Sequence, residues 1–167
     1  MTVARTEPAV EPVSAQARCG TRPNHRILIV DDDTSILQLS TEVLTNSGYA
    51  VDTAEDGAAA WQALNTDNYD LLITDHNMPK VTGLELVGKL RAARMALPVI
   101  LATGAMPTEE LDRQPWLRIE ATLLKPFTIP MLLETVQEVL RATDNNRDQS
   151  ELQPIGRSQP ASDCLRL

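Results

Sequence analysis

Five short apolar runs alternate along the chain with stretches in which apolar residues recur at helical spacing. The runs lie at 27–30, 49–54, 70–74, 98–102 and 121–124. Such short runs of Leu, Ile and Val predict strands buried on both faces, and the stretches between them predict amphipathic helices. Five β-α units in succession predict an α/β domain. Its doubly wound parallel sheet has five strands, flanked by five helices and joined by right-handed crossovers.

The same pattern divides the chain into one domain and two tails. The alternation covers 26–143, which is long enough for one domain with its own core. Segments 1–25 and 144–167 are polar and aperiodic, and we predict that both are disordered tails. Because the second tail is too short to fold into an output module, the sequence predicts a stand-alone domain.

Capping and breaking residues refine the predicted helices. Thr34 and Ser35 are typical N-cap residues for the first helix, and Gly48 suits a left-handed cap at its end. The fourth helix begins near Pro107, and Pro115 should shorten or break it. The last helix is predicted to begin at Pro130, because proline is favoured in a first helical turn.

The residues that end the predicted strands carry the candidate chemistry. They are Asp31 and Asp32 after the first run, Asp75 after the third, Thr103 after the fourth and Lys125 after the fifth. The carboxyl ends of parallel strands share one edge of the sheet, where open α/β sheets bind ligands. Crowded carboxylates repel one another, and Mg²⁺, which prefers oxygen ligands, relieves that repulsion. Together with a lysine and a hydroxyl, they describe a receptor for a phosphoryl group, with Asp75 as the nucleophile.

Each of these residues also has an ordinary structural explanation. A strand-end aspartate such as Asp75 can begin a turn or cap a helix. Asp33 is best explained as a loop or helix-cap acid, and His76 as a solvated loop residue. Trp116 is either an exposed anchor for a partner or a side chain packed on the sheet.

Four segments together resemble one family. ILIVDDD, LLITDHNMPKVTG, PVILATG and LLKPF are similar, in order and spacing, to the four motifs of the response-regulator receiver domain of two-component signalling. The resemblance covers 26–143. It implies a flavodoxin-like sheet with strand order 2-1-3-4-5, phosphorylated by a histidine kinase or histidine phosphotransfer protein, and an unknown downstream protein partner.

The resemblance assigns a role to each matching residue. Asp75 would be the phospho-acceptor, and Mg²⁺ would be held by Asp32 directly, Asp31 through water, Asp75 and the backbone carbonyl of Asn77. Thr103 would bond a phosphoryl oxygen and shift towards it. Lys125 would pair with Asp75 and then with the phosphoryl group, and a cis peptide bond before Pro126 would place that lysine.

The chain departs from the family at three places. Thr122 occupies the position where receivers usually carry a switch aromatic, so any signal must pass through the backbone of the fourth strand and helix. Pro115 interrupts the fourth helix. Ala105 cannot orient water by hydrogen bonds, which predicts slow self-dephosphorylation.

Composition and charge restrict the partners. The net charge is −8 and lies in 26–143, which argues against sequence-independent nucleic-acid binding. The chain has no apolar run long enough for a membrane span and no signal peptide, so a cytoplasmic location is expected. Cys19 and Cys164, the two cysteines, have no zinc-site spacing.

Two alternatives to a working receiver stay open. One is a phosphorylation-independent pseudo-receiver, a binding module that Thr122 would suit. The other is a Mg²⁺-dependent phosphohydrolase with an aspartate nucleophile. The run 31–33 contains its Asp-x-Asp pattern, but the chain has no cap segment. In the leading interpretation the domain is not an enzyme beyond accepting a phosphoryl group and slowly hydrolysing it.

Overall fold

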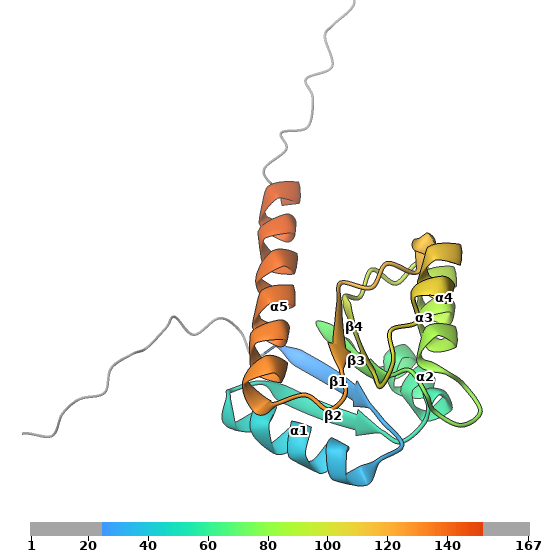
Figure 1. Cartoon of the computed structure of the whole chain (residues 1–167). Coiled ribbons are helices and arrows are strands. Elements are labelled where there is room, and N and C mark those ends of the chain that lie inside the picture. The colour runs from blue at the N-terminus through green and yellow to red at the C-terminus, as the bar shows by residue number, and fades with distance from the viewer. Residues whose placement is uncertain (1–24, 152–167) are drawn as a thin grey trace, which may run out of the picture.

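The computed structural model describes residues 25–151, which form a sheet of five parallel strands covered by helices on both faces (Figure 1). The strands are β1 (Arg26–Val30), β2 (Ala50–Ala54), β3 (Leu71–Asp75), β4 (Val99–Thr103) and β5 (Ala121–Leu124). Their order in the sheet is β2-β1-β3-β4-β5. The predicted α/β class, strand number and strand order are therefore confirmed.

The helices divide between the two faces of the sheet. They are α1 (Thr34–Asn46), α2 (Gly57–Thr66), α3 (Gly83–Ala92), α4 (Thr108–Arg113), the short 3₁₀ helix η1 (Pro115–Leu117) and α5 (Ile129–Glu151). Alternate residues of the central strands point to opposite faces, so Leu28 packs with α2, α3 and η1, whereas Ile29 packs with α1 and α5. Helices α1, α2, α3 and α5 thus bury their apolar stripes against one of two cores that share the sheet.

The strand register brings the carboxyl ends of the central strands together. Val30 pairs with Thr74 across β1 and β3, and Asp75 pairs with Ala102 across β3 and β4. Asp31, Asp75 and Thr103 therefore follow one another along a single edge of the sheet. All five residues of β3 and all five of β4 are buried.

The N-cap of the first helix lies one residue before the predicted cap. Asp33 is the N-cap, and its side chain accepts a hydrogen bond from the backbone N–H of Ser35 at 2.8 Å. The prediction of Thr34 and Ser35 as the cap was wrong by this one residue, because a carboxylate was available immediately before them. The ordinary explanation of Asp33 as a helix cap is confirmed, and Gly48 has the expected positive φ of 93°.

The fourth helical region is short and interrupted, as Pro115 predicts. Helix α4 has six residues, and Pro115 opens the separate helix η1. In the described part of the chain, α4 has no buried residue and no side-chain cap.

Helix α5 is longer than predicted. It continues to Glu151, so residues 144–151 are helical where a disordered tail was predicted, while the domain boundary at 143 stays a prediction. Residues 144–151 are polar and lack apolar periodicity, but a helix already nucleated by packing is extended at little cost. His25 Nε2 also lies 3.4 Å from the Asp144 carboxylate, which ties this part of α5 to the start of β1. The remaining tail predictions, with Cys19 and Cys164, lie outside the described residues.

Among residues 25–151, no helix combines the length and the apolar character that a membrane crossing requires.

Candidate functional site

The candidate site lies at the carboxyl edge of the sheet, where β1 and β3 end in buried carboxylates. Asp31 and Asp75 are only 3% and 5% exposed. Asp31 directly follows β1 and Asp75 is the last residue of β3, and both strands are held between two neighbours, so neither backbone position can move without disturbing the sheet. The two acids are therefore fixed in an environment where an ionised carboxylate needs a partner.

Lys125 provides that partner from the end of β5. Its Nζ lies 2.6 Å from Asp31 Oδ2 and 2.6 Å from Asp75 Oδ1, so one ammonium group bridges both carboxylates. The Lys125 backbone N–H donates to the Thr103 carbonyl oxygen at 2.8 Å. The peptide bond between Lys125 and Pro126 is cis, as predicted.

Burial and pairing act in opposite directions on these groups. Burial raises the pKa of Asp31, and hydrogen bonds from Lys125 and from the backbone of Asp33 offset only part of that rise. For Lys125, burial lowers the pKa, but Asp31 and Asp75 together outweigh it and the net pKa is raised. The lysine therefore stays charged, while the site holds more negative charge than one lysine can neutralise.

The loop after β3 is packed against the candidate acceptor. The backbone N–H of Asn77 donates to Asp75 Oδ2 at 2.8 Å. A Cβ atom at Gly83 would overlap the carbonyl oxygen of Asp75, and the Gly83 N–H donates to the His76 carbonyl at 3.1 Å. Only glycine lets the start of α3 approach this closely, so Gly83 helps to fix the acceptor backbone.

Thr103 is fully buried at the end of β4, the strand beside β3. Its hydroxyl donates to the Ala105 carbonyl at 2.7 Å and accepts from the Ala105 N–H at 3.3 Å. The hydroxyl is thus bonded to the loop that leads into α4. The structure places Thr103 at the same sheet edge as Asp31, Asp75 and Lys125.

The predicted metal ligands are only partly assembled. Within residues 25–151, no three His, Cys, Asp or Glu side chains form a ready metal cluster, and Asp32 is exposed to solvent. Mg²⁺ nevertheless usually takes one or two carboxylates and completes its shell with water and phosphate oxygens. Two buried carboxylates sharing a single cation, next to a third acid, are a donor set that fits such an ion.

His76 differs from its predicted role as a solvated loop residue. Its side chain is 14% exposed, and Nε2 lies 3.8 Å from Glu110 Oε2 on α4. Its Nδ1 is buried without a hydrogen-bond partner among the described residues. Glu110 was missed altogether, because nothing in the spacing of a weak, Pro-interrupted helix indicates which of its acids faces the β3 loop.

Comparison with known proteins identifies the family that has this fold, with Asp31, Asp75 and Lys125 at the carboxyl edge of its sheet. The family model of the response regulator receiver domain matches residues 27–137. The chain belongs to this family, and the resemblance of its four motifs is confirmed. Receiver domains are signalling modules of two-component systems rather than typical enzymes.

Its curated relatives differ in how much of them this chain covers. It is 31% identical to the chemotaxis protein CheY of Pseudomonas aeruginosa, and the match covers 68% of this chain and 94% of that protein. It is 34% identical over 131 residues to the alkaline phosphatase synthesis transcriptional regulatory protein PhoP of Bacillus subtilis, covering 77% of this chain and 54% of that protein. The chain spans about half the length of the transcriptional regulators it matches.

Solved structures agree with the fold. A CheY-like receiver domain protein from Methanospirillum hungatei superimposes with a TM-score of 0.70 at 29% identity, covering 74% of this chain and 99% of that one. The response regulator TrrA of Thermotoga maritima, solved in complex with Mg²⁺ and BeF, gives a TM-score of 0.61 at 36% identity. That match covers 69% of this chain and 98% of TrrA.

Proposed function

We propose that this chain is a cytoplasmic phospho-acceptor response regulator. It receives a phosphoryl group on Asp75 from a histidine kinase or a histidine phosphotransfer protein. The observation that carries the proposal is the Nζ of Lys125, 2.6 Å from both Asp31 and Asp75 at the buried end of β3. An acidic residue held this way can act as a nucleophile, and the ammonium group beside it can balance the negative charge of an incoming phosphoryl group.

The transfer step follows from the positions of these side chains. A carboxylate oxygen of Asp75 attacks the phosphorus, and the bond from phosphorus to the donor's histidine nitrogen breaks. The leaving imidazole keeps the electron pair and later takes a proton from solvent. Lys125 remains beside the new acyl phosphate and balances its charge, while the Thr103 hydroxyl lies at the same edge to donate to a phosphoryl oxygen.

Asp31, Asp32, Asp75 and the backbone carbonyl of Asn77 are the groups that would hold Mg²⁺. When bound, the ion would neutralise charge on the phosphoryl oxygens. Asp31 supports this assignment, because its raised pKa shows that the lysine alone does not relieve its burial. The TrrA relative, solved with Mg²⁺ and BeF, supports the same chemistry at a similar fold.

The signal leaves through contacts with a downstream protein that remains to be identified. Thr122 on β5 offers no aromatic ring to swing, so the route from the site begins with the Thr103 hydroxyl and the Ala105 carbonyl to which it is bonded. Phosphorylation adds about −1.5 to −2 charges at the site and would bias this loop.

The acyl phosphate should decay slowly. Ala105 presents no side chain that could orient an attacking water, and its backbone already bonds to Thr103. After removal of the donor we expect the phosphoprotein to persist for minutes rather than seconds. Loss within seconds, followed by intact mass, would contradict this expectation.

The test is phosphorylation of the purified chain by acetyl phosphate, read by intact mass with and without Mg²⁺. A single phosphoryl addition that needs Mg²⁺ and is lost in Asp75→Asn is the expected result. Asp33→Asn is the matched control, because Asp33 is a neighbouring acid that caps α1. The Asp33→Asn protein should still accept a phosphoryl group on Asp75. If the folded wild-type protein binds Mg²⁺ but accepts no phosphoryl group, the pseudo-receiver alternative replaces this proposal.

A further inference from the structure

The two ends of the α4–η1 segment are held by very different contacts, and the η1 end is the firmer one. Leu117 is fully buried in the core under α3. Arg91 of α3 donates through Nε to the Leu117 carbonyl at 2.7 Å and through Nη2 to the Arg118 carbonyl at 2.6 Å. These two bonds fix the last residue of η1 and the residue after it directly to α3.

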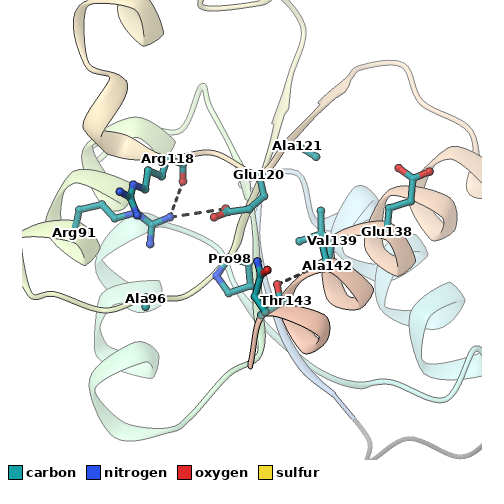
Figure 2. A pocket seen from close by; sticks show the side chains of 11 residues that line it. Arg91, Ala96, Pro98, Arg118, Glu120, Ala121, Glu138, Val139, Ala142 and Thr143 are labelled. Carbon is teal, nitrogen blue, oxygen red and sulfur yellow. Dashed lines mark hydrogen bonds and ion pairs between the residues drawn. The ribbon is translucent and has the colours of Figure 1, made fainter. Parts of the chain in front are cut away.

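Arg91 is itself immobilised. Its Nη1 donates to the carbonyl oxygens of Met95 at 3.0 Å and Leu97 at 2.8 Å, so the guanidinium joins the end of α3 to η1. Figure 2 shows Arg91 beside Arg118 and Glu120, among the residues that line a pocket. Glu120 Oε2 lies 3.8 Å from Arg91 Nη2. Four carbonyl bonds to one mostly covered arginine make a rigid attachment.

Helix α4 has no comparable attachment. In the described part of the chain none of its residues is buried and no side chain caps it. Leu111 is half-buried and touches the core, and the Glu109–Arg113 pair at 3.7 Å is exposed on both sides. An exposed pair of this kind adds little stability, so α4 depends on its neighbours for its position.

The nearest of these neighbours lies in the loop after β3, residues 76–82, which we call the acceptor loop. Glu110, in the first turn of α4, lies 3.8 Å from His76 Nε2. His76 directly follows Asp75, its N–H donates to the Ala102 carbonyl at 2.8 Å, and its ring is mostly covered. A displacement of the loop therefore moves the ring against Glu110, and the Thr103–Ala105 bonds lead to the same end of α4.

We propose that α4 is a hinged segment: its first turn follows the acceptor loop through His76 and Glu110, and Arg91 holds η1 still as the pivot. The inference rests on the proposed function for its stimulus, which is phosphorylation of Asp75. It adds to that function which part of the α4–η1 segment changes position and which part stays fixed. Trp116, whose indole lies over Gly88 of α3, belongs to the fixed end, so the surface that changes is the first turn of α4 and not the tryptophan.

The unequal attachment is tested first, without any donor, by amide hydrogen exchange on the full chain. The Leu111 and Leu117 amides each donate to a backbone carbonyl, so their exchange rates compare the two ends directly. We expect Leu111 to exchange at least about tenfold faster than Leu117, as a locally opening segment does. Arg91→Lys should speed exchange at Leu117, and Glu110→Gln should speed it at Leu111 only. Arg113→Gln, a neutralising change elsewhere on α4, is the control and should alter neither rate. Equal rates in the wild-type chain would overturn the proposal.

The response is tested second, with acetyl phosphate and Mg²⁺, and intact mass measured on the same sample. On phosphorylation the Leu111 amide resonance should shift while the indole N–H of Trp116 stays in place. Glu110→Gln should reduce the Leu111 shift by about half or more, and Arg113→Gln should leave it unchanged. A Trp116 shift as large as that of Leu111 would overturn the pivot. Absence of phosphoryl addition would sink the proposed function and this response with it, while the exchange rates would still decide the unequal attachment.

Discussion

Two clusters in this molecule have the same inventory of charges, one cation between two aspartates, at opposite edges of the sheet. At the carboxyl edge, Lys125 bridges Asp31 and Asp75 at 2.6 Å each. At the amino edge, Arg26 bridges Asp52 at 2.7 Å and Asp67 at 2.9 Å. Distance alone would not distinguish them.

Burial does distinguish them. The side chains of the Lys125 cluster are between 5% and 20% exposed, whereas those of the Arg26 cluster are between 38% and 41% exposed. In water the second cluster gains little from pairing, because solvent screens it. In the covered site, burial raises the pKa of Asp31, and the hydrogen bond from Lys125 offsets part of that rise. Depth in the fold, rather than charge pattern, therefore distinguishes the cluster at the candidate site from the other one.

The two cations also suit different tasks. Arg26 presents a planar fork that bonds two carboxylates at once, and its guanidinium lies 4.9 Å from the centre of the Tyr69 ring. That arrangement joins β1, β2 and the segment before β3 as a structural clamp. Lys125 is a single point charge on a flexible stem, which can follow a charge that moves from carboxylate to phosphoryl group.

Removing the buried cation should have the largest effect. In Lys125→Met, two covered carboxylates lose their partner, and the free energy of unfolding at pH 7 should fall by about 3 kcal/mol. Urea denaturation measures this. Lys80→Met is the control, since Lys80 is 72% exposed, and it should change stability by less than about 0.5 kcal/mol. Equal effects of the two variants would show that burial does not set the cost of losing a lysine.

A smaller effect is expected from moving the backbone beneath the acceptor. Gly83→Ala places a Cβ atom against the Asp75 carbonyl and should cost about 2 kcal/mol of stability, with slower phosphorylation. Gly88→Ala in the same helix is the matched control. Its Cβ would lie 3.6 Å from Trp116, an ordinary contact, so a gain of about 0.5 kcal/mol or more is expected from helix propensity. Thermal unfolding of the two variants, measured in parallel, tests this. A gain of stability in Gly83→Ala or a loss in Gly88→Ala would contradict the expectation.

Neutralising Asp31 should raise the free energy of unfolding at pH 7, by less than the two preceding substitutions alter it. Because its folded pKa is raised above the ordinary value of 3.8, the folded state favours the protonated acid. That stability is fully present below pH 3.8 and is lost as pH rises through the folded pKa. The difference in the free energy of unfolding between Asp31→Asn and the wild-type chain should therefore grow with rising pH and then become constant. A gap that is constant with pH in urea titrations would contradict the burial argument.

The smallest effect is expected at the exposed cluster. Arg26→Gln should lower the denaturation midpoint only slightly, and the difference should shrink in high salt because these pairs are screened. Its rate of phosphorylation by acetyl phosphate should match that of the wild-type chain. A loss of stability as large as that of Lys125→Met, and unaffected by salt, would show that the two clusters are equivalent.

Most of the fold could be predicted from sequence because each element is specified locally. The apolar runs are short and separated, and each strand has its own helix, so the parallel sheet follows from alternation. The convergence of Asp31, Asp75 and Lys125 follows from the shared edge of that sheet. The roles of these residues, and that of Asn77 as a metal ligand, stay predictions.

What the sequence did not reveal depends on contacts between distant segments or on context. The His76–Glu110 contact joins the loop after β3 to helix α4, and no local pattern encodes the relative position of these two segments. Likewise, Arg91 looks like one more surface arginine in its helix, and only the fold brings the carbonyls of Leu117 and Arg118 to it. The length of α5 was missed for a different reason, because helix propagation needs no apolar stripe once packing has started it.

The length of α5 has a geometrical consequence. Its 23 residues span about 35 Å, roughly twice the length of a five-residue strand, and Figure 1 shows its last turns projecting beyond the sheet. The helix begins at Ile129, four residues after the lysine that bridges the two acids. A tilt of about 5° at that end would carry the far end through about 3 Å, by the rise of an α-helix alone. A rearrangement too small to alter the sheet would thus displace the far end of α5 by a few ångströms on the opposite side of the molecule.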